Sequence, residues 1–284
     1  MAALLRGGRF VFFAVQCRGR AAAHAHATQP SGGARMKTLR VVTYNIHKGV
    51  QGLGPLRRLE IHNLSHAMEL MDADVLCLQE VRKLHQREAR HFPHWPQAPQ
   101  ADYLAPSGYE AIYRTNAITR HGEHGNALLS KWPVVQHQHE DMSDHRLEQR
   151  GLLHVELDVA GQSLHVLVVH LGLIRAGRGR QLQQLTQFIQ REIPPDAPLL
   201  VAGDFNDLPA WVARQLAPAG LKAPVTKPCV TFPSRLPLVQ LDHVLARGLT
   251  PVSATAPRGM SWARMSDHLP LITEWQLAAE TPAC

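Results

Sequence analysis

Asp204 and Asn206 are the two side chains whose types and spacing most clearly suggest chemistry in this sequence. They lie in Gly203-Asp204-Phe205-Asn206, directly after an apolar run at residues 198–202 that reads as a buried strand. Residues two apart on an extended segment point to the same side, and ligands of α/β sheets bind at the carboxyl ends of strands. An ordinary strand followed by an Asx turn explains this segment equally well, so the two residues need companions before they indicate a site.

Similar polar residues stand beside other strand-like runs along the chain. The strand-like runs cover residues 39–44, 74–79, 164–169, 239–241 and 269–272. The polar residues next to them are, in chain order, Asn45, Glu80, His170, Asp242 and the pair Asp267-His268. One apolar strand that ends in a polar residue is routine. Its repetition predicts that these side chains assemble into a single site with Asp204 and Asn206.

The residue types of this set favour a hard divalent cation. Its carboxylates are Glu80, Asp204, Asp242 and Asp267, and its carboxamides are Asn45 and Asn206. Oxygen ligands of this kind suit Mg²⁺ or Mn²⁺ better than Zn²⁺, which leaves His170 and His268 free to transfer protons or stabilise charge. No Ser or Cys lies in a nucleophile motif. The set therefore predicts metal-assisted attack by water on a phosphate ester.

Four further polar residues could contact a phosphate group, and each has an ordinary structural alternative. They are His47, Lys48, Asn126 and Arg150. His47 and Lys48 follow the first strand and fit a surface turn equally well. Asn126 either lines the pocket or holds a tight turn, and Arg150 is either a phosphate ligand or an ordinary surface arginine.

The charge of the chain is concentrated at its N-terminus. The sequence has 284 residues and a formal net charge of +7, but residues 1–40 alone carry seven Lys and Arg residues and no acid. The remaining 23 Lys and Arg residues balance all 23 Asp and Glu residues. Because the body is neutral, its charge does not indicate a nucleic-acid partner, although local basic patches are compatible with zero net charge.

Residues 1–36 are predicted to form a disordered extension rich in Arg and Ala. A cleaved signal peptide is the alternative, but the apolar stretch at residues 10–15 is short for one, and Arg18 and Arg20 follow it. Met36 is a second candidate for the true start of the protein. The four cysteines show no paired or metal-type spacing, so we expect a cytoplasmic protein, with secretion through the N-terminal segment left open.

The elements needed to position the site alternate between strands and helices. Helical spacing of apolar residues predicts helices at residues 56–71 and 180–193. Further strands are expected near residues 109–113, 126–130, 134–139 and 151–159, and residues 82–108 read as an irregular insertion. No apolar run approaches the roughly 20 residues of a membrane span. The pattern predicts one α/β domain of mixed strand direction over residues 37–284, which we expect to be monomeric.

With these residues in this order, the sequence resembles the endonuclease/exonuclease/phosphatase superfamily, whose fold is that of deoxyribonuclease I. The resemblance covers residues 39–277, nearly the whole body, with several motifs in family order. These are Thr43-Tyr44-Asn45-Ile46, Leu78-Gln79-Glu80-Val81, residues 125–130, His170-Leu171, Gly203-Asp204-Phe205-Asn206, Leu241-Asp242 and Ser266-Asp267-His268. Each motif is weak alone, but their order is specific. The resemblance implies an α/β fold, a four-layer α/β/β/α sandwich of two mixed β-sheets flanked by helices.

The resemblance also implies a role for each residue of the set. Glu80 would be the main metal ligand, with Asn45 and Asp267 in the metal shell. Asp204 and Asn206 would position the attacking water and bind the phosphate. His268, paired with Asp242, would be the general base or would stabilise the transition state, and His170 would contact the phosphate or act as an acid. Members of the family are described with one metal or two.

The motifs also indicate which branch of the superfamily the chain resembles. Inositol-polyphosphate phosphatases usually carry Asp-Arg where this chain has Asp242-His243, abasic-site repair enzymes have a basic surface, and secreted deoxyribonucleases have disulfides. The chain therefore resembles an uncharacterised bacterial branch, akin to sphingomyelinase-like and lipid-remodelling members. We expect a metal-dependent phosphodiesterase or phosphatase acting on a small or lipid-linked phosphodiester. A DNA endonuclease or exonuclease, and an inactive phosphate-binding scaffold, are the alternatives.

Overall fold

The computed structural model describes residues 37–277, apart from residues 53, 147 and 225–227. The described residues belong to one compact unit that begins at Met36. The predicted N-terminal extension, residues 1–36, lies outside the described residues. Within the described part of the chain, no helix has the length and apolar character needed to span a bilayer.

Two β-sheets form the centre of the domain. The larger has the strand order β12-β13-β1-β4-β6-β5, and the smaller has the order β11-β10-β9-β8-β7. The strands of the larger sheet are β1 (Lys37–Asn45), β4 (Val75–Val81), β5 (Glu110–Thr119), β6 (Gly122–Ser130), β12 (Leu249–Thr255) and β13 (Leu271–Leu277). Those of the smaller sheet are β7 (Val134–Asp141), β8 (Gly151–Val159), β9 (Gln162–His170), β10 (Leu199–Asp204) and β11 (Asp242–Arg247). Both sheets contain parallel and antiparallel pairs, as predicted.

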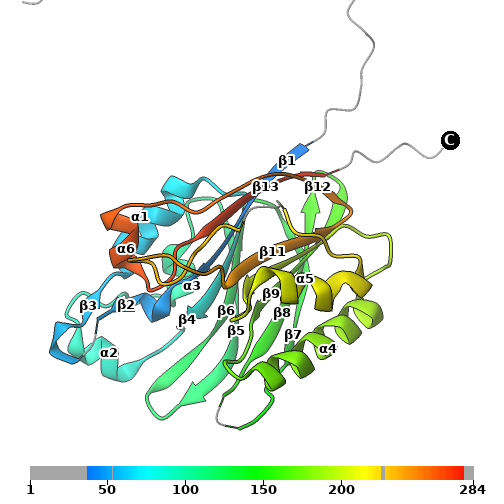
Figure 1. Cartoon of the computed structure of the whole chain (residues 1–284). Coiled ribbons are helices and arrows are strands. Elements are labelled where there is room, and N and C mark those ends of the chain that lie inside the picture. Colours follow the sequence, from blue (N-terminus) through cyan, green and yellow to red (C-terminus); the bar gives the residue numbers. More distant parts are fainter. Residues whose placement is uncertain (1–36, 53, 147, 225–227, 278–284) are drawn as a thin grey trace, which may run out of the picture. The chain divides into compact units, whose positions relative to one another are not determined.

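Helices cover the outer face of each sheet (Figure 1). The larger sheet is covered by α1 (Ile61–Met71), α3 (Gln100–Leu104) and α6 (Met260–Met265), and the smaller by α4 (Arg175–Glu192) and α5 (Pro209–Leu216). The short elements are α2 (Gln86–His91), η1 (His47–Gly49), η2 (Gly54–Leu56), η3 (Ala217–Ala219) and the hairpin of β2 (Val50–Gln51) and β3 (Arg58–Leu59). The predicted α/β/β/α sandwich is thereby confirmed.

Alternate residues of the central strands enter different cores. In β1, Leu39 and Val41 belong to the core between the sheets, whereas Val42 and Tyr44 belong to the core beneath α1. Both faces of such a strand are buried, which explains why apolar side chains occur on both faces of β1 and do not simply alternate with polar ones. Trp275 in β13 is fully buried in the core between the sheets.

Two helix boundaries differ from the sequence-based prediction. The helix expected at residues 56–71 begins only at Ile61, because Arg58-Leu59 pairs with Val50-Gln51 as a hairpin. The helix expected at 180–193 begins earlier, at Arg175. The apolar stripe could not mark that start, because the first turn of α4 contains mainly Arg and Gly. Residues 82–108, expected to be irregular, include the short helices α2 and α3.

The strand register brings the polar strand ends to one edge of the sandwich. Strands β1 and β4 run parallel with Asn45 opposite Gln79, and β9 and β10 run parallel with Asp204 opposite His170. Strand β11 is antiparallel to β10 and begins at Asp242, directly opposite Asp204. We call this the site edge.

Gly203 allows the strands that carry the site to approach closely. A Cβ atom at this position would lie 1.9 Å from the carbonyl oxygen of Val169 in β9. No side chain fits at that distance without moving the backbone. The glycine before Asp204 is therefore required by the β9–β10 contact that places Asp204 beside His170.

Candidate active site

Asp204 lies at the centre of the site and is almost completely buried. Its Oδ2 accepts a hydrogen bond from Asn45 Nδ2 at 3.0 Å and lies 3.5 Å from His268 Nε2 and 3.6 Å from His170 Nε2. Its Oδ1 accepts a hydrogen bond from the Asn206 amide at 3.0 Å. Burial, reinforced by Asp242, raises the pKa of Asp204 to about 7. A carboxylate with this pKa is suited to accept a proton near neutral pH.

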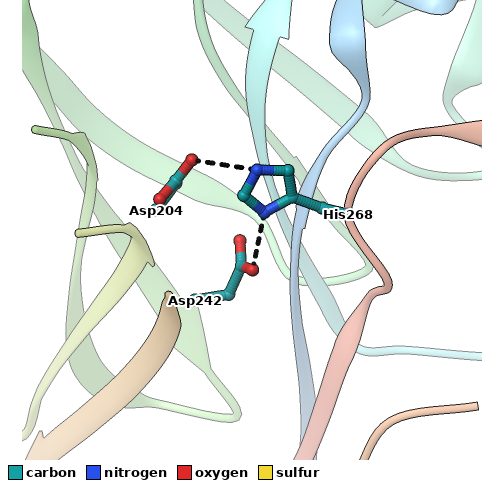
Figure 2. A group of neighbouring side chains, drawn as sticks. All are labelled: Asp204, Asp242 and His268. Carbon is teal, nitrogen blue, oxygen red and sulfur yellow. Dashed lines mark hydrogen bonds and ion pairs between the residues drawn. The ribbon is translucent and has the colours of Figure 1, made fainter. Parts of the chain in front are cut away.

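His268 is held between two carboxylates, as Figure 2 shows. Its Nδ1 lies 2.8 Å from Asp242 Oδ2, and the same oxygen accepts a hydrogen bond from Thr231 Oγ1 at 2.6 Å. The ring of Phe232 packs 4.9 Å from the imidazole, centroid to centroid. These contacts fix the ring so that Nε2 faces Asp204. Burial opposes the charged imidazolium, but Asp242 and Asp204 outweigh it and raise the pKa of His268 to about 10.

Glu80 projects from an irregularity in β4. The pairing of β4 with β6 shifts register between Leu78 and Val81, and Glu80 itself has φ of 57°. Such a backbone conformation is uncommon for Glu, and bulges of this kind re-aim side chains next to active sites. Glu80 Oε2 lies 2.8 Å from Lys48 Nζ. Burial alone would raise the pKa of Glu80, but Lys48 and His170 outweigh it and lower that pKa to about 2.

His47 and Lys48 each bind one of the predicted metal carboxylates. His47 Nδ1 lies 3.1 Å from Asp267 Oδ2, while Lys48 binds Glu80. Burial opposes ionisation of Asp267, but the bond to His47 lowers its pKa below the ordinary value. Both His47 and Lys48 have positive φ angles, 46° and 62°. The turn that was one interpretation of these two residues is present, and it directs both side chains to the site.

Ser266 joins the first and last strands of the larger sheet at the site. Its Oγ donates a hydrogen bond of 2.6 Å to the carbonyl oxygen of Asn45. Asn45 Oδ1 accepts a hydrogen bond from the His47 amide, so both ends of the Asn45 carboxamide are engaged. A role for Ser266 could not be predicted from the sequence, where its place directly before Asp267-His268 is the only signal.

His170 and Asn206 line the side of the site formed by the smaller sheet. Burial, with the nearby charge of Arg150, holds the pKa of His170 well below its ordinary value, so the imidazole is neutral at pH 7. Asn206 has φ of 52° and its Nδ2 donates to the Leu171 carbonyl at 2.9 Å. The amide of Asn206 closes an Asx turn with the Asp204 side chain, so the predicted turn is present and Asn206 also lies at the site.

Arg150 lies close to the site but is already engaged. Its Nε donates to the Leu171 carbonyl at 3.2 Å, and its Nη2 lies 3.1 Å from Glu148 Oε1. Arg150 is thus anchored beside the strand end that carries His170. Its Nη1 also donates to the Gln149 carbonyl at 3.3 Å, so a phosphate contact from this arginine would have to use the N–H groups that these three partners do not occupy.

Asn126 joins the two sheets. It is fully buried, and its Nδ2 donates to the carbonyl oxygens of Gly151 in β8 and Val168 in β9, at 2.9 and 3.1 Å. Its Oδ1 is buried without a hydrogen-bond partner among the described residues. The side-chain nitrogen of Asn126 therefore holds the two sheets together and has no hydrogen left to donate to a phosphate.

Replacement of Asn126 by alanine should destabilise the fold. Two buried carbonyl groups would lose their donor, and we expect the free energy of unfolding to fall by about 2–4 kcal/mol. Urea denaturation measures this directly. The matched control is Gln187→Ala on α4, at an exposed position, which should cost no more than about 1 kcal/mol. Full stability of the Asn126→Ala variant together with a raised KM would instead assign Asn126 to phosphate binding.

His268 should also give the folded protein a stability that depends on pH. Its pKa is raised from 6.5 to about 10 on folding, so the folded state binds this proton more tightly than the unfolded chain. The stabilisation is fully present below pH 6.5 and is lost as the pH rises through about 10. In EDTA, Tm should fall over this range more steeply for the wild type than for His268→Gln. Parallel Tm curves would count against the assignment.

The structure offers two groups of oxygen-rich side chains that could hold a cation. Ligand atoms of Asp204, Asp242 and His268 lie within 4.8 Å of one another. In this group, however, His268 Nδ1 and Asp242 Oδ2 are already bonded to each other. The second group is Glu80 and Asp267, which are close enough for the charge of Glu80 to act on the pKa of Asp267; Lys48 already binds Glu80, and His47 binds Asp267. A hard divalent cation fits this second group better, because it can replace Lys48 without breaking the His268–Asp242 pair.

Comparison with known proteins agrees with the fold. The model of the endonuclease/exonuclease/phosphatase family matches residues 42–268. The uncharacterised protein YbhP of Escherichia coli K12 is 36% identical over 251 residues, which are 84% of this chain and 97% of YbhP. A family member from Bacteroides vulgatus superposes with a TM-score of 0.67 at 17% identity, over 85% of this chain and 100% of that one. One from Beutenbergia cavernae gives 0.65 at 20% identity, over 87% of this chain and 73% of that one. The chain belongs to the endonuclease/exonuclease/phosphatase family.

Proposed function

We propose that this protein is a divalent-metal-dependent hydrolase of phosphate esters in which water is the nucleophile. The observation that carries the proposal is the buried series Asp242–His268–Asp204. In it one imidazole is fixed between two carboxylates at 2.8 and 3.5 Å. A structural role alone does not call for this arrangement, because burial of three ionisable groups is costly. Strongly shifted pKa values in such a cluster are typical of active sites.

The shifted pKa values suggest how the residues divide the work. Asp204, with a pKa of about 7, is suited to orient the attacking water and accept its proton. His268, with a pKa of about 10, stays protonated at neutral pH and is suited to stabilise negative charge on the phosphoryl oxygens. Of the two roles considered for His268 from the sequence, transition-state stabilisation therefore has the stronger support. Asp242 keeps the imidazole charged and oriented.

A cation held by Glu80 and Asp267, with Asn45 beside them, would supply Lewis-acid stabilisation of the phosphoryl group. We propose Mg²⁺ or Mn²⁺ because the donors are hard oxygens. The neutral His170 is placed to donate a hydrogen bond to a phosphate oxygen or to the leaving group. Asn206, through the hydrogen bond from its backbone amide, keeps Asp204 in position.

A small or lipid-linked phosphodiester is the proposed substrate class, and DNA is the second candidate. DNA is favoured by a structural neighbour, zebrafish TDP2, which was solved with a single-strand DNA product (TM-score 0.59). Another neighbour, ANGEL2, is a 2',3'-cyclic phosphatase. The formally neutral body of the chain favours the first class. An inactive phosphate-binding scaffold is disfavoured because it would not need the buried Asp242–His268–Asp204 series. We propose that the protein acts as a monomer in the cytoplasm.

Hydrolysis assays with substrates of each class test this function. The panel comprises bis-p-nitrophenyl phosphate, plasmid and abasic-site DNA, and phospholipids, each with Mg²⁺, Mn²⁺ or EDTA. We expect turnover of the small ester and of a lipid headgroup ester, abolished by EDTA. Turnover of DNA alone would move the assignment to a nuclease, and equal rates in EDTA would end the metal-dependent proposal.

A further inference from the structure

Large exposed apolar side chains are concentrated in loops at the site edge. Leu84 follows β4, and Leu173 and Ile174 follow β9, the strands that carry Glu80 and His170 at their ends near the site. Ile118 is 73% exposed at the β5–β6 turn, which lies at the same edge because β6 is antiparallel to β4. At the opposite ends of the strands the surface is poorer in such residues, although Leu70 and Val135 are exposed there.

The segment before β11 adds both apolar and basic side chains beside the site. Leu236 and Leu238 are 66% and 67% exposed. This segment is tied to the site by Ser234, whose amide donates to the Asp267 carbonyl at 2.7 Å and whose Oγ donates to the Ser266 carbonyl at 2.6 Å. The two leucines are therefore held next to the residues that carry the proposed chemistry.

A groove of about 320 Å³ separates this segment from α6, and arginines line it. Its lining consists of Arg58, Arg235, Met260, Ala263 and Arg264, so the described lining includes no carboxylate. Arg58 is paired with Glu60. Neither Arg235 nor Arg264 takes part in an ion pair with another described residue, and both are exposed.

A second basic groove lies on the other side of the β2–β3 hairpin. It has a volume of about 720 Å³, and Arg57, Arg87 and Arg90 line it with three histidines. Its carboxylate, Glu88, is buried and already paired with Arg57 and Arg82. Two Arg-lined grooves therefore lie beside the site edge, even though the body of the chain is formally neutral.

We propose that the rim formed by Arg235, Leu236, Leu238, Met260 and Arg264 docks onto an anionic phospholipid surface. Exposed leucine and methionine can enter the headgroup region, and the adjacent arginines can bind lipid phosphates. A nucleic-acid strand would use the arginines but would gain little from the apolar side chains between them. Docking would turn the site toward the headgroups. That the docked site then cleaves a headgroup ester rests on the proposed function.

Vesicle flotation tests the docking independently of catalysis. Full-length protein in EDTA is mixed with vesicles of phosphatidylcholine, with or without phosphatidylglycerol. We expect wild type to float with the anionic vesicles and to dissociate as salt rises. Leu236→Ser with Leu238→Ser should weaken binding at least about tenfold, and so should Arg235→Glu with Arg264→Glu. All variants retain the basic residues 1–40, which contribute equally.

Matched variants away from the rim separate docking from general effects. Leu70→Ser with Val135→Ser and, for charge, Lys222→Glu should bind vesicles as wild type does, and unchanged Tm values would show that every variant folds. Equal flotation of rim variants and wild type, or no flotation at all, would overturn the proposal. Tight binding of a single-stranded oligonucleotide that the Arg variants lose and the Leu variants keep would also overturn it. Flotation without ester hydrolysis would support the docking proposal and contradict only the proposed function.

Discussion

Replacement of His268 by alanine is expected to lower kcat for bis-p-nitrophenyl phosphate by about 10³-fold. The substitution removes the imidazole that lies between Asp242 and Asp204, at 2.8 and 3.5 Å, and with it the positive charge that we propose stabilises the phosphoryl oxygens. KM should change much less, because the charge matters most in the transition state. Initial rates at saturating substrate and metal measure the effect.

The variant His66→Ala is the control for this experiment. His66 is exposed on α1, away from the strand ends, and its loss should change kcat by no more than about twofold. Asp242→Asn should approach the His268→Ala value, because it leaves the imidazole without the carboxylate that keeps it protonated. A kcat for His268→Ala within about tenfold of wild type would refute the proposed role.

Replacement of Glu80 by glutamine should remove most of the activation by metal. The carboxamide keeps the shape of the side chain but removes the charge that a divalent cation needs. We expect kcat at a fixed Mg²⁺ concentration to fall about 10²-fold or more. Mn²⁺ binding, measured by electron paramagnetic resonance without substrate, should weaken in parallel. That second measurement separates loss of the cation from loss of catalysis.

Lys48→Met is the informative contrast for Glu80→Gln. The ammonium of Lys48 lies 2.8 Å from Glu80 Oε2, so it competes with a cation for the same carboxylate. Its removal should tighten Mn²⁺ binding, whereas Glu80→Gln should weaken it. Weaker Mn²⁺ binding in both variants would show that Lys48 supports the metal site, and unchanged binding in Glu80→Gln would exclude Glu80 as a ligand.

Much of the site could be predicted from the sequence because strand ends obey a simple rule. Asn45, Glu80, His170 and Asp204 each follow an apolar run, and the ends of parallel strands meet at one edge. The pairings among these residues could not be predicted. The contact between Lys48 and Glu80 depends on the positive φ angles of His47 and Lys48 and on the register shift in β4. Neither feature can be recognised from the pattern of apolar residues in the sequence.

The contact that a loop makes with Asp242 could not be predicted either. Thr231 binds Asp242 from 11 positions away, and nothing in the sequence indicates that its hydroxyl serves this carboxylate. The start of the helix at residues 56–71 was wrong for a related reason. Leu59 fits a helical stripe, but in the structure it belongs to the two-residue strand β3, which pairs with β2. Such short strand pairs depend on tertiary packing, which the local sequence does not reveal.

The hydrogen bond from Ser266 to Asn45 implies that the site assembles late in the synthesis of the chain. It spans 221 positions of sequence, and the strand after it, β13, pairs with β1 in the interior of the larger sheet. A ribosome therefore releases nearly the whole chain before Asp267 and His268 can reach their partners. The growing polypeptide therefore passes through synthesis without the assembled Asp242–His268–Asp204 series, which can form only after the segment before β13 has emerged.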